Sequence, residues 1–164
     1  MVTQINQALA EIRPDNEVAI TGGTINGTTI GATTAAAGTF TTLAIAAGAI
    51  ISGTYSPDLF NVTNVTGSTP YACQYMRVGN VVNVSGKVDV DPTLVAATVL
   101  GVSLPITSTL SAAEKCSGIA ASNTIASEVA AITADTVNNR AQLEWVTVSL
   151  ANHSMFFDFQ YLVT

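Results

Sequence analysis

The chain has 164 residues and a net charge of −6, and only 10% of its residues are Asp, Glu, Lys or Arg, where about 25% is usual for a soluble domain. Its mean hydropathy of +0.44 is high, yet no window approaches the ~20 consecutive apolar residues that a membrane span needs. The five basic residues are scattered, which argues against a nucleic-acid-binding stripe and against a basic amphipathic segment that would insert into a membrane.

The first residues carry the only helical pattern, with apolar side chains at the spacing of a short coiled coil: Val2, Ile5, Leu9 and Ile12. Pro14 ends this pattern, and an isolated helix of this length is marginal in water. We therefore predict that residues 1–19 form a short helix or arm that anchors the chain to its own copies or to a larger particle. Because no basic region and apolar run follow Met1, we expect no signal peptide and synthesis in a cytoplasm.

Residues 18–57 contain no charged side chain and show a repeat of five residues. Its leading positions are Ile20, Ile25, Ile30, Ala35, Phe40, Ile45, Ile50 and Tyr55. A period of five fits neither a helix nor a flat strand, and a fixed period indicates stacked structure. A single-chain solenoid, a disordered linker and an intertwined stalk of three chains are the alternatives. We favour the homotrimeric stalk over residues 20–55, because three chains would bury the uncharged faces; its trimerisation residues are Ile20, Ile25, Ile30, Phe40, Ile45 and Ile50.

Short strands are predicted after the repeat. Turn residues at 56–58 and 67–70 bracket a transition strand at 59–65. From residue 71 onward, Gly79-Asn80 is a hairpin signal, and valines alternate with polar residues over 81–90. Further strands are predicted at 98–104, 117–121, 125–132, 142–150 and 155–163. The sequence therefore predicts an all-β chain with a transition at 56–70 and an antiparallel β-sandwich knob, jelly-roll-like, at 71–164.

Two parts of the chain resemble a known family. Residues 20–31 (ITGGTINGTTIG) and 36–43 (AAGTFTTL) are similar to the stalk motif of bacteriophage tail-fibre and virion-fibre proteins. Residues 75–88 (YMRVGNVVNVSGKV), 102–105 (VSLP) and 157–163 (FDFQYLV) resemble the C-terminal knob that often follows that motif.

This resemblance implies a homotrimer in the virion, made in the bacterial host cytoplasm and without catalytic activity. It implies attachment to another virion protein through the N-terminus, with an outward knob that contacts a host-surface glycan or protein. Because only residues 1–19 precede the stalk, a capsid decoration or head-fibre protein with the same trimeric plan is the alternative. A carbohydrate-binding module is a second alternative.

We searched the sequence for catalytic and ligand-binding patterns. His153 is the only histidine and has no partner at ligand spacing, so we expect no zinc site and no Ser-His-Asp triad. The acids are spread along the chain, which argues against a hydrolase. Gly22-Gly23 lack the lysine of a phosphate-binding loop. We therefore expect no enzyme, no cofactor and no metal.

Five further residues have two interpretations each. Asp89 and Asp91 share one strand face and, with Asp58 or Glu114, would offer oxygen ligands to calcium; two solvated carboxylates are the favoured reading. Trp145 is a candidate receptor contact that stacks on a sugar, although core or interface packing is favoured. Cys73 and Cys116 lack metal-ligand spacing, and we expect them to be buried thiols.

Overall fold

The computed structural model describes residues 44–45 and 48–164, with side chains from Ile50 onward. Strands dominate this part of the chain, and its one helical turn is the 3-10 turn η1 (Ala113–Lys115). The all-β class is thus confirmed. The predicted anchor residues Val2, Ile5, Leu9 and Ile12 lie outside the described residues, as do Ile20, Ile25, Ile30 and Phe40 of the predicted stalk.

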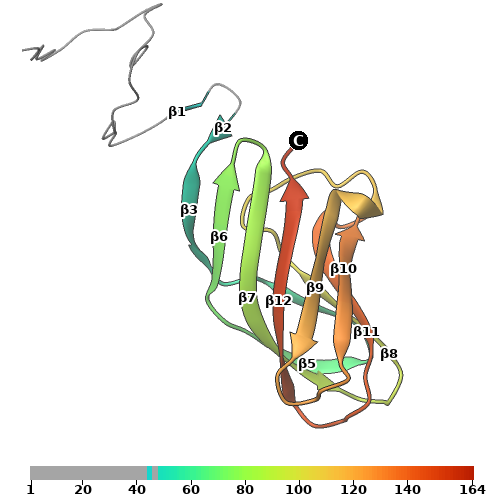
Figure 1. The fold of residues 1–164 in the computed structure, drawn as a ribbon. Helices are drawn as coiled ribbons and strands as arrows, with labels where there is room; N and C mark the ends of the chain where they lie inside the picture. The colour runs from blue at the N-terminus through green and yellow to red at the C-terminus, as the bar shows by residue number, and fades with distance from the viewer. Residues whose placement is uncertain (1–43, 46–47) are drawn as a thin grey trace, which may run out of the picture. The chain divides into compact units, whose positions relative to one another are not determined.

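The strands are short apart from β7 and β12 (Figure 1). Their bounds are β1 Ala44–Ile45, β2 Gly48–Ala49, β3 Ile51–Tyr55, β4 Leu59–Thr63, β5 Val65–Pro70, β6 Cys73–Val78, β7 Val81–Pro92, β8 Ala97–Val102, β9 Cys116–Ser122, β10 Val129–Asp135, β11 Arg140–Val146 and β12 His153–Leu162. β1 and β2 pair only with each other among the described strands, and β3 to β12 form one antiparallel sheet.

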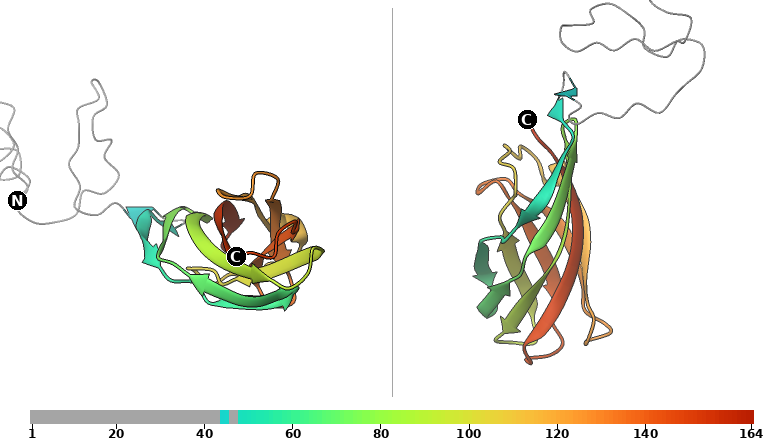
Figure 2. Two further views of the ribbon diagram at one scale, coloured as in Figure 1. Left: turned by 90° about the horizontal axis from the view of Figure 1, so that it is seen from below. Right: turned by 90° about the vertical axis from the view of Figure 1, so that its left-hand side faces the viewer.

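The sheet has the strand order β3-β6-β7-β12-β9-β10-β11-β8-β4, and it curls so that its two sides approach each other (Figure 2, left). The segment 59–70 bridges those sides, since β4 pairs with β8 and β5 pairs with β7. Asn64 makes the bend between β4 and β5 with a left-handed φ of 58°, a conformation that asparagine tolerates better than most residues. The fold is therefore one curled sheet, where the sequence predicted the two packed sheets of a sandwich.

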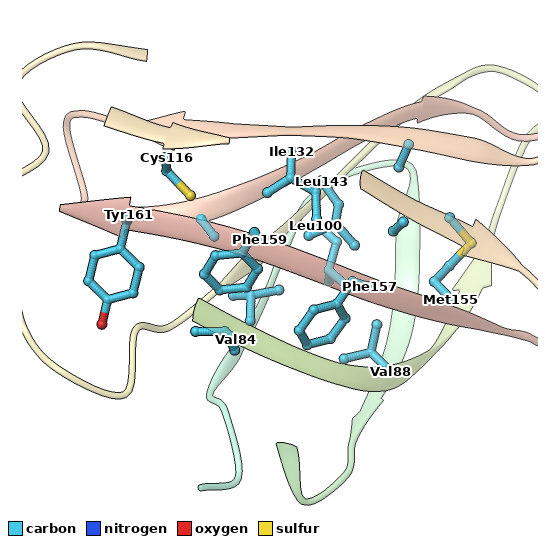
Figure 3. Close-up of a cluster of buried hydrophobic side chains, with 14 of the residues drawn as sticks. Val84, Val88, Leu100, Cys116, Ile132, Leu143, Met155, Phe157, Phe159 and Tyr161 are labelled. Atoms are coloured by element: carbon cyan, nitrogen blue, oxygen red, sulfur yellow. The ribbon is translucent and has the colours of Figure 1, made fainter. Parts of the chain in front are cut away.

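The core lies on the concave side of this sheet. Along β12 every second side chain is buried, from His153 through Met155, Phe157 and Phe159 to Tyr161. The rings of Phe157 and Phe159 are stacked with centroids 5.7 Å apart. Figure 3 shows these aromatic rings between the valines of β7 and the side chains of β8, β10 and β11. Such alternation is what a strand with one buried face requires.

Several predictions for the C-terminal part are confirmed. β6 and β7 form the expected hairpin around Gly79-Asn80, in which Gly79 has a φ of 61°. The valines predicted to face inward are buried, namely Val82, Val84, Val88 and Val90. The predicted strand ends agree less well with the structure. A strand was predicted at 125–132, but residues 123–128 form the loop before β10, which begins at Val129.

The sheet domain starts earlier in the chain than the sequence predicted. Residues 51–55, predicted as the end of the stalk, form β3 and pair with β6 from Ile51↔Arg77 to Tyr55↔Cys73. Residues 59–70 of the predicted transition form β4 and β5. The sheet therefore begins at residue 51 rather than 71, because the sequence pattern alone does not reveal pairings between distant segments. Of the predicted stalk positions, Ile45 lies in β1 and Ile50 is half-exposed.

The domain has two distinct ends. Ile51 pairs with Arg77 beside the β6–β7 hairpin, and Leu162 pairs with Val81 there, so the chain enters the sheet at this hairpin end. His153 pairs with Val90 at the other end of β12. Since β12 has ten residues that rise about 3.4 Å each, the ends are roughly 30 Å apart. We call the second one the loop end; it comprises residues 93–96, 123–128 and 147–152 (bottom of Figure 1).

Candidate interaction surface at the loop end

The loop end displays aliphatic side chains to solvent. Four of them are at least half exposed, namely Leu94 (64%), Val95 (62%), Val148 (50%) and Leu150 (52%), and Val146 (63%) adjoins them at the end of β11. The three loops contain a single charged residue, Glu128, whose exposure is 1%. An exposed apolar surface without charges is typical of a site that contacts another molecule.

Glu128 holds the β11–β12 loop from inside the domain. Its Oε1 atom accepts hydrogen bonds from the Thr147 hydroxyl at 2.6 Å, from the Val148 N–H at 2.6 Å and from the Ser149 N–H at 3.3 Å. Three consecutive residues of the loop are thus fixed by one carboxylate oxygen. Hydrogen bonds to an ionised acceptor are stronger than neutral ones, so this loop is well ordered by its own chain.

The other oxygen of Glu128 faces His153. Oε2 lies 2.6 Å from Nε2 of the imidazole, and both side chains are buried. Nδ1 of His153 lies 2.8 Å from the carbonyl oxygen of Ala151. A carbonyl only accepts hydrogen bonds, so Nδ1 carries a hydrogen and donates it.

The contacts of Glu128 favour its charged form. Burial acts to raise the pKa of Glu128, but the hydrogen bonds from Thr147 and Val148 and the neighbouring His153 outweigh it and hold the pKa below its usual range. This carboxylate faces Nε2 of His153 inside the domain. A buried pair of this kind is costly to break from one side.

The β7–β8 loop is fixed to the same framework. The Thr147 N–H donates to the Ala96 carbonyl at 3.0 Å, which joins the β7–β8 and β11–β12 loops. Asn64 donates to the Leu94 carbonyl and accepts from the Leu94 N–H, both at 2.7 Å. The exposed aliphatic side chains therefore project from loops whose backbones are held in place.

Sequence reasoning missed Glu128. The one available signal was that Glu128 is the single charged residue between Lys115 and Asp135. His153, the histidine without a partner at ligand spacing, lies in this buried pair.

Trp145 lies on the inner face of β11 and is 5% exposed. Its ring does not present a face to solvent, so in this structure it is not available to stack on a sugar. Its Nε1 atom has no hydrogen-bond partner within the described residues. The position is that of a core residue.

The structure also shows where the acidic residues considered as calcium ligands lie. Asp89 accepts hydrogen bonds from Ser154 at 2.6 Å and Tyr71 at 2.7 Å, and Lys87 Nζ lies 3.3 Å from it. Asp58 lies in the β3–β4 loop and Glu114 in η1. Within residues 44–45 and 48–164, no group of three His, Cys, Asp or Glu side chains, with Asp91 included, is arranged to hold a metal ion.

Cys73 and Cys116 are free and buried. Burial raises the pKa of Cys116 to about 12, and it raises the pKa of Cys73 as well. Both therefore remain thiols at neutral pH and pack as small apolar groups.

A groove of about 630 Å³ lies beside β4, the loop at 103–109 and the β10–β11 turn. Phe60 is 41% exposed, and the Arg140 guanidinium lies 4.5 Å from the centre of its ring. Arg140 Nε also pairs with Asp135 Oδ2 at 2.8 Å. Leu104 and several hydroxyl and amide side chains complete the lining, the latter being Ser103, Thr107, Ser108, Thr109, Asn138, Asn139 and Thr164.

Over the part of the chain that the structure describes, no helix is long and apolar enough to cross a membrane. No protein-family model matches the sequence, and comparison with curated proteins finds no match either.

Proposed function

We propose that this chain is a structural, non-enzymatic bacteriophage virion protein: a short homotrimeric fibre, attached to the particle by its N-terminal region, whose outward domain contacts the host surface in the manner of a tail fibre. The observation that supports this best is that the two ends of the sheet domain differ. The chain enters at the hairpin end, and the exposed, uncharged aliphatic loops lie at the opposite end.

The low charge of the chain supports assembly into a trimer. Residues 18–57 carry no charge. On the outer face of the sheet, Ala121 of β9 pairs with Phe156 of β12 and with Val129 of β10. Ile119 lies two residues before Ala121 on β9, on the same face. Phe156, Val129 and Ile119 are each about half exposed, which adds apolar surface that neighbouring copies would cover.

Sedimentation velocity of the full chain tests the assembly. We expect a single species with three times the mass of the chain, and a monomer at micromolar concentration would overturn the proposal. Cryo-electron microscopy of the particle then tests the position. Three-fold spikes at the tail would agree with host attachment, whereas spikes on the head would favour the capsid decoration or head-fibre alternative.

The groove at Phe60 favours one other function, that of a carbohydrate-binding module. A half-exposed aromatic ring surrounded by hydroxyl and amide groups matches the apolar and polar faces of a sugar. Glycan-array binding that Phe60→Ala abolishes would support this function. Binding that persists in Phe60→Ala, or no binding at all, would count against it.

A further inference from the structure

An exposed aliphatic row crosses the outer face of the sheet at the hairpin end (top of Figure 1). Val78 of β6 pairs with Val81 of β7, which pairs with Leu162 of β12. Ile50 adjoins Val78, because β3 begins directly after Ile50 and pairs with β6 up to the residue before Val78. These four side chains, which we call the aliphatic row, are between 38% and 49% exposed. Contiguous apolar side chains at a surface mark a contact site, whereas scattered ones do not.

The outer face next to the aliphatic row carries no charge either. Met76 of β6, Asn83 of β7 and Gln160 of β12 form the adjoining row, paired with one another in that order. The first charge on the outer face of these three strands is Asp158, one row further toward the loop end. The uncharged part of this face is therefore the part where the chain enters the sheet.

The aliphatic row is continuous with the uncharged repeat. Residues 18–57 carry no charge, and Ile50 is both a leading residue of their repeat and the first residue of the row. In the proposed trimer, three chains associate through this repeat, which brings three hairpin ends together. We propose that the aliphatic row is the contact between the sheet domains of neighbouring copies of this chain. The inference rests on the proposed trimer and assigns to it a contact inside the sheet domain.

The shape of the row suits a three-fold contact, in which two different surfaces meet. At one end, Val81 and Leu162 line a hollow of about 270 Å³ beside η1 and β9, to which η1 contributes one acidic and one basic residue. At the other end, Ile50 and Val78 are each nearly half exposed. These aliphatic side chains of one copy can enter the hollow of the next, and the same contact repeated three times closes a ring.

The aliphatic row is smaller than a self-sufficient interface. A stable interface involves about 20–30 residues a side, whereas this row and the adjoining one have four and three. We therefore expect the row to order the sheet domains of a trimer whose association depends on the repeat. A variant in the row should change the exposure and the stability of the sheet domains, and it should leave the mass of the assembly unchanged.

Thiol labelling of the full chain tests the contact. Val78→Cys and Val148→Cys place a thiol at positions that are equally exposed in a single copy, at 47% and 50%. In the assembled protein we expect a maleimide to label Val78→Cys about tenfold more slowly or less, because a covered group reacts only after local opening. Val148 lies at the loop end, where no copy covers it. The buried thiols of Cys73 and Cys116 supply the background, which is measured in the natural chain.

The outcomes separate this contact from the proposed function. Equal labelling rates in a protein that sediments as a trimer would overturn the contact and leave the trimer standing. A monomer in sedimentation would overturn the proposed function and the contact together. Slow labelling of Val78→Cys that persists in a monomeric Ile25→Asp variant would also overturn the contact, because the cover would then come from the same chain.

A charge in the row provides a second measurement. Val81→Asp and Val81→Asn introduce side chains of the same shape, so that only the charge differs between them. We expect the Val81→Asp trimer to melt at a lower temperature than the Val81→Asn trimer, because each carboxylate is buried without a partner between two copies. On an uncovered face the two variants would melt alike, since surface substitutions have small effects. Equal melting temperatures would therefore overturn the contact.

Discussion

The side chains of Glu128 and His153 meet inside the domain, where Oε2 of Glu128 lies 2.6 Å from Nε2 of His153. Glu128 directly precedes β10 and His153 begins β12. The pair and its hydrogen bonds fix the backbone of 147–151, which carries Val148 and Leu150 into solvent. A polar network in the core thus supports an apolar surface outside it.

Replacing one partner of the pair should destabilise the domain strongly. We expect Glu128→Ala to lower the free energy of unfolding by about 3–5 kcal/mol, because His153 is left as an uncompensated buried group. Urea denaturation measures this change. Glu144→Gln is the matched control, since Glu144 is exposed on the outer face of β11, and it should change stability by no more than about 0.5 kcal/mol. Equal effects of the two substitutions would contradict the role of Glu128.

The pair also predicts a dependence on pH. The pKa of Glu128 is lower in the folded state than in the unfolded chain, so its contribution to stability is present above the ordinary pKa of glutamate and is lost as the pH falls through the lowered value. We expect the difference in stability between the natural chain and Glu128→Gln to shrink as the pH falls from 7 to 3. Taking this difference removes the parallel contributions of Asp89 and Asp135, whose pKa values are also lowered. A difference that is constant with pH would contradict the assignment.

Gly86 occupies an inward position of β7 that leaves no room for a side chain. A Cβ there would clash with Cys73 Sγ, would lie 2.8 Å from Cys73 Cβ and would lie 3.0 Å from Phe157 Cζ. We expect Gly86→Ala to cost about 1–3 kcal/mol, the usual cost of overpacking, as measured by chemical denaturation. Gly67→Ala is the control, because its nearest atom would be at 3.6 Å. Adding Cys73→Ala should recover part of the loss, since the two substitutions act on one contact.

The sequence was informative where the pattern is local. The alternation of Val82, Val84, Val88 and Val90 predicted a strand with one buried face, and Gly79-Asn80 predicted its hairpin. No local pattern in the sequence indicated which distant segments pair. The union of β3 with β6, and the bridge that β4 and β5 make across the curled sheet, depend on contacts that a local pattern does not encode.

The candidate site was harder to predict than the fold. Trp145 is the type of residue that often binds ligands, yet it alternates inward with Ala141 and Leu143. The exposed residues of the loop end are ordinary aliphatic side chains, and only the fold shows that they gather at one end.

The proposed trimer predicts the effect of a charge in the repeat. Ile25→Asp or Ile30→Asp would place three carboxylates near one axis, where like charges repel and each loses hydration. We expect either variant to sediment as a monomer. Asn26→Asp is the control, since it introduces the same charge one place after a leading position and should remain trimeric. A trimer of Ile25→Asp with unchanged melting would contradict the stalk.

The loop end predicts a separate effect on host attachment. Leu94→Asp and Leu150→Asp add a charge to the exposed aliphatic surface without disturbing the core, since both side chains are more than half exposed. We expect the purified protein to compete with virus particles for adsorption to host cells, and each variant to compete at least tenfold more weakly, because a buried unpaired charge costs more than the 1.4 kcal/mol of a tenfold change in binding. Val137→Asp is the matched control: Val137 is 86% exposed in the β10–β11 turn, away from the loop end. If Val137→Asp alone lost competition, the contact would lie at the hairpin end. If all three variants competed as well as the natural chain, the aliphatic loops would have no part in attachment, and a role on the capsid would become the better proposal.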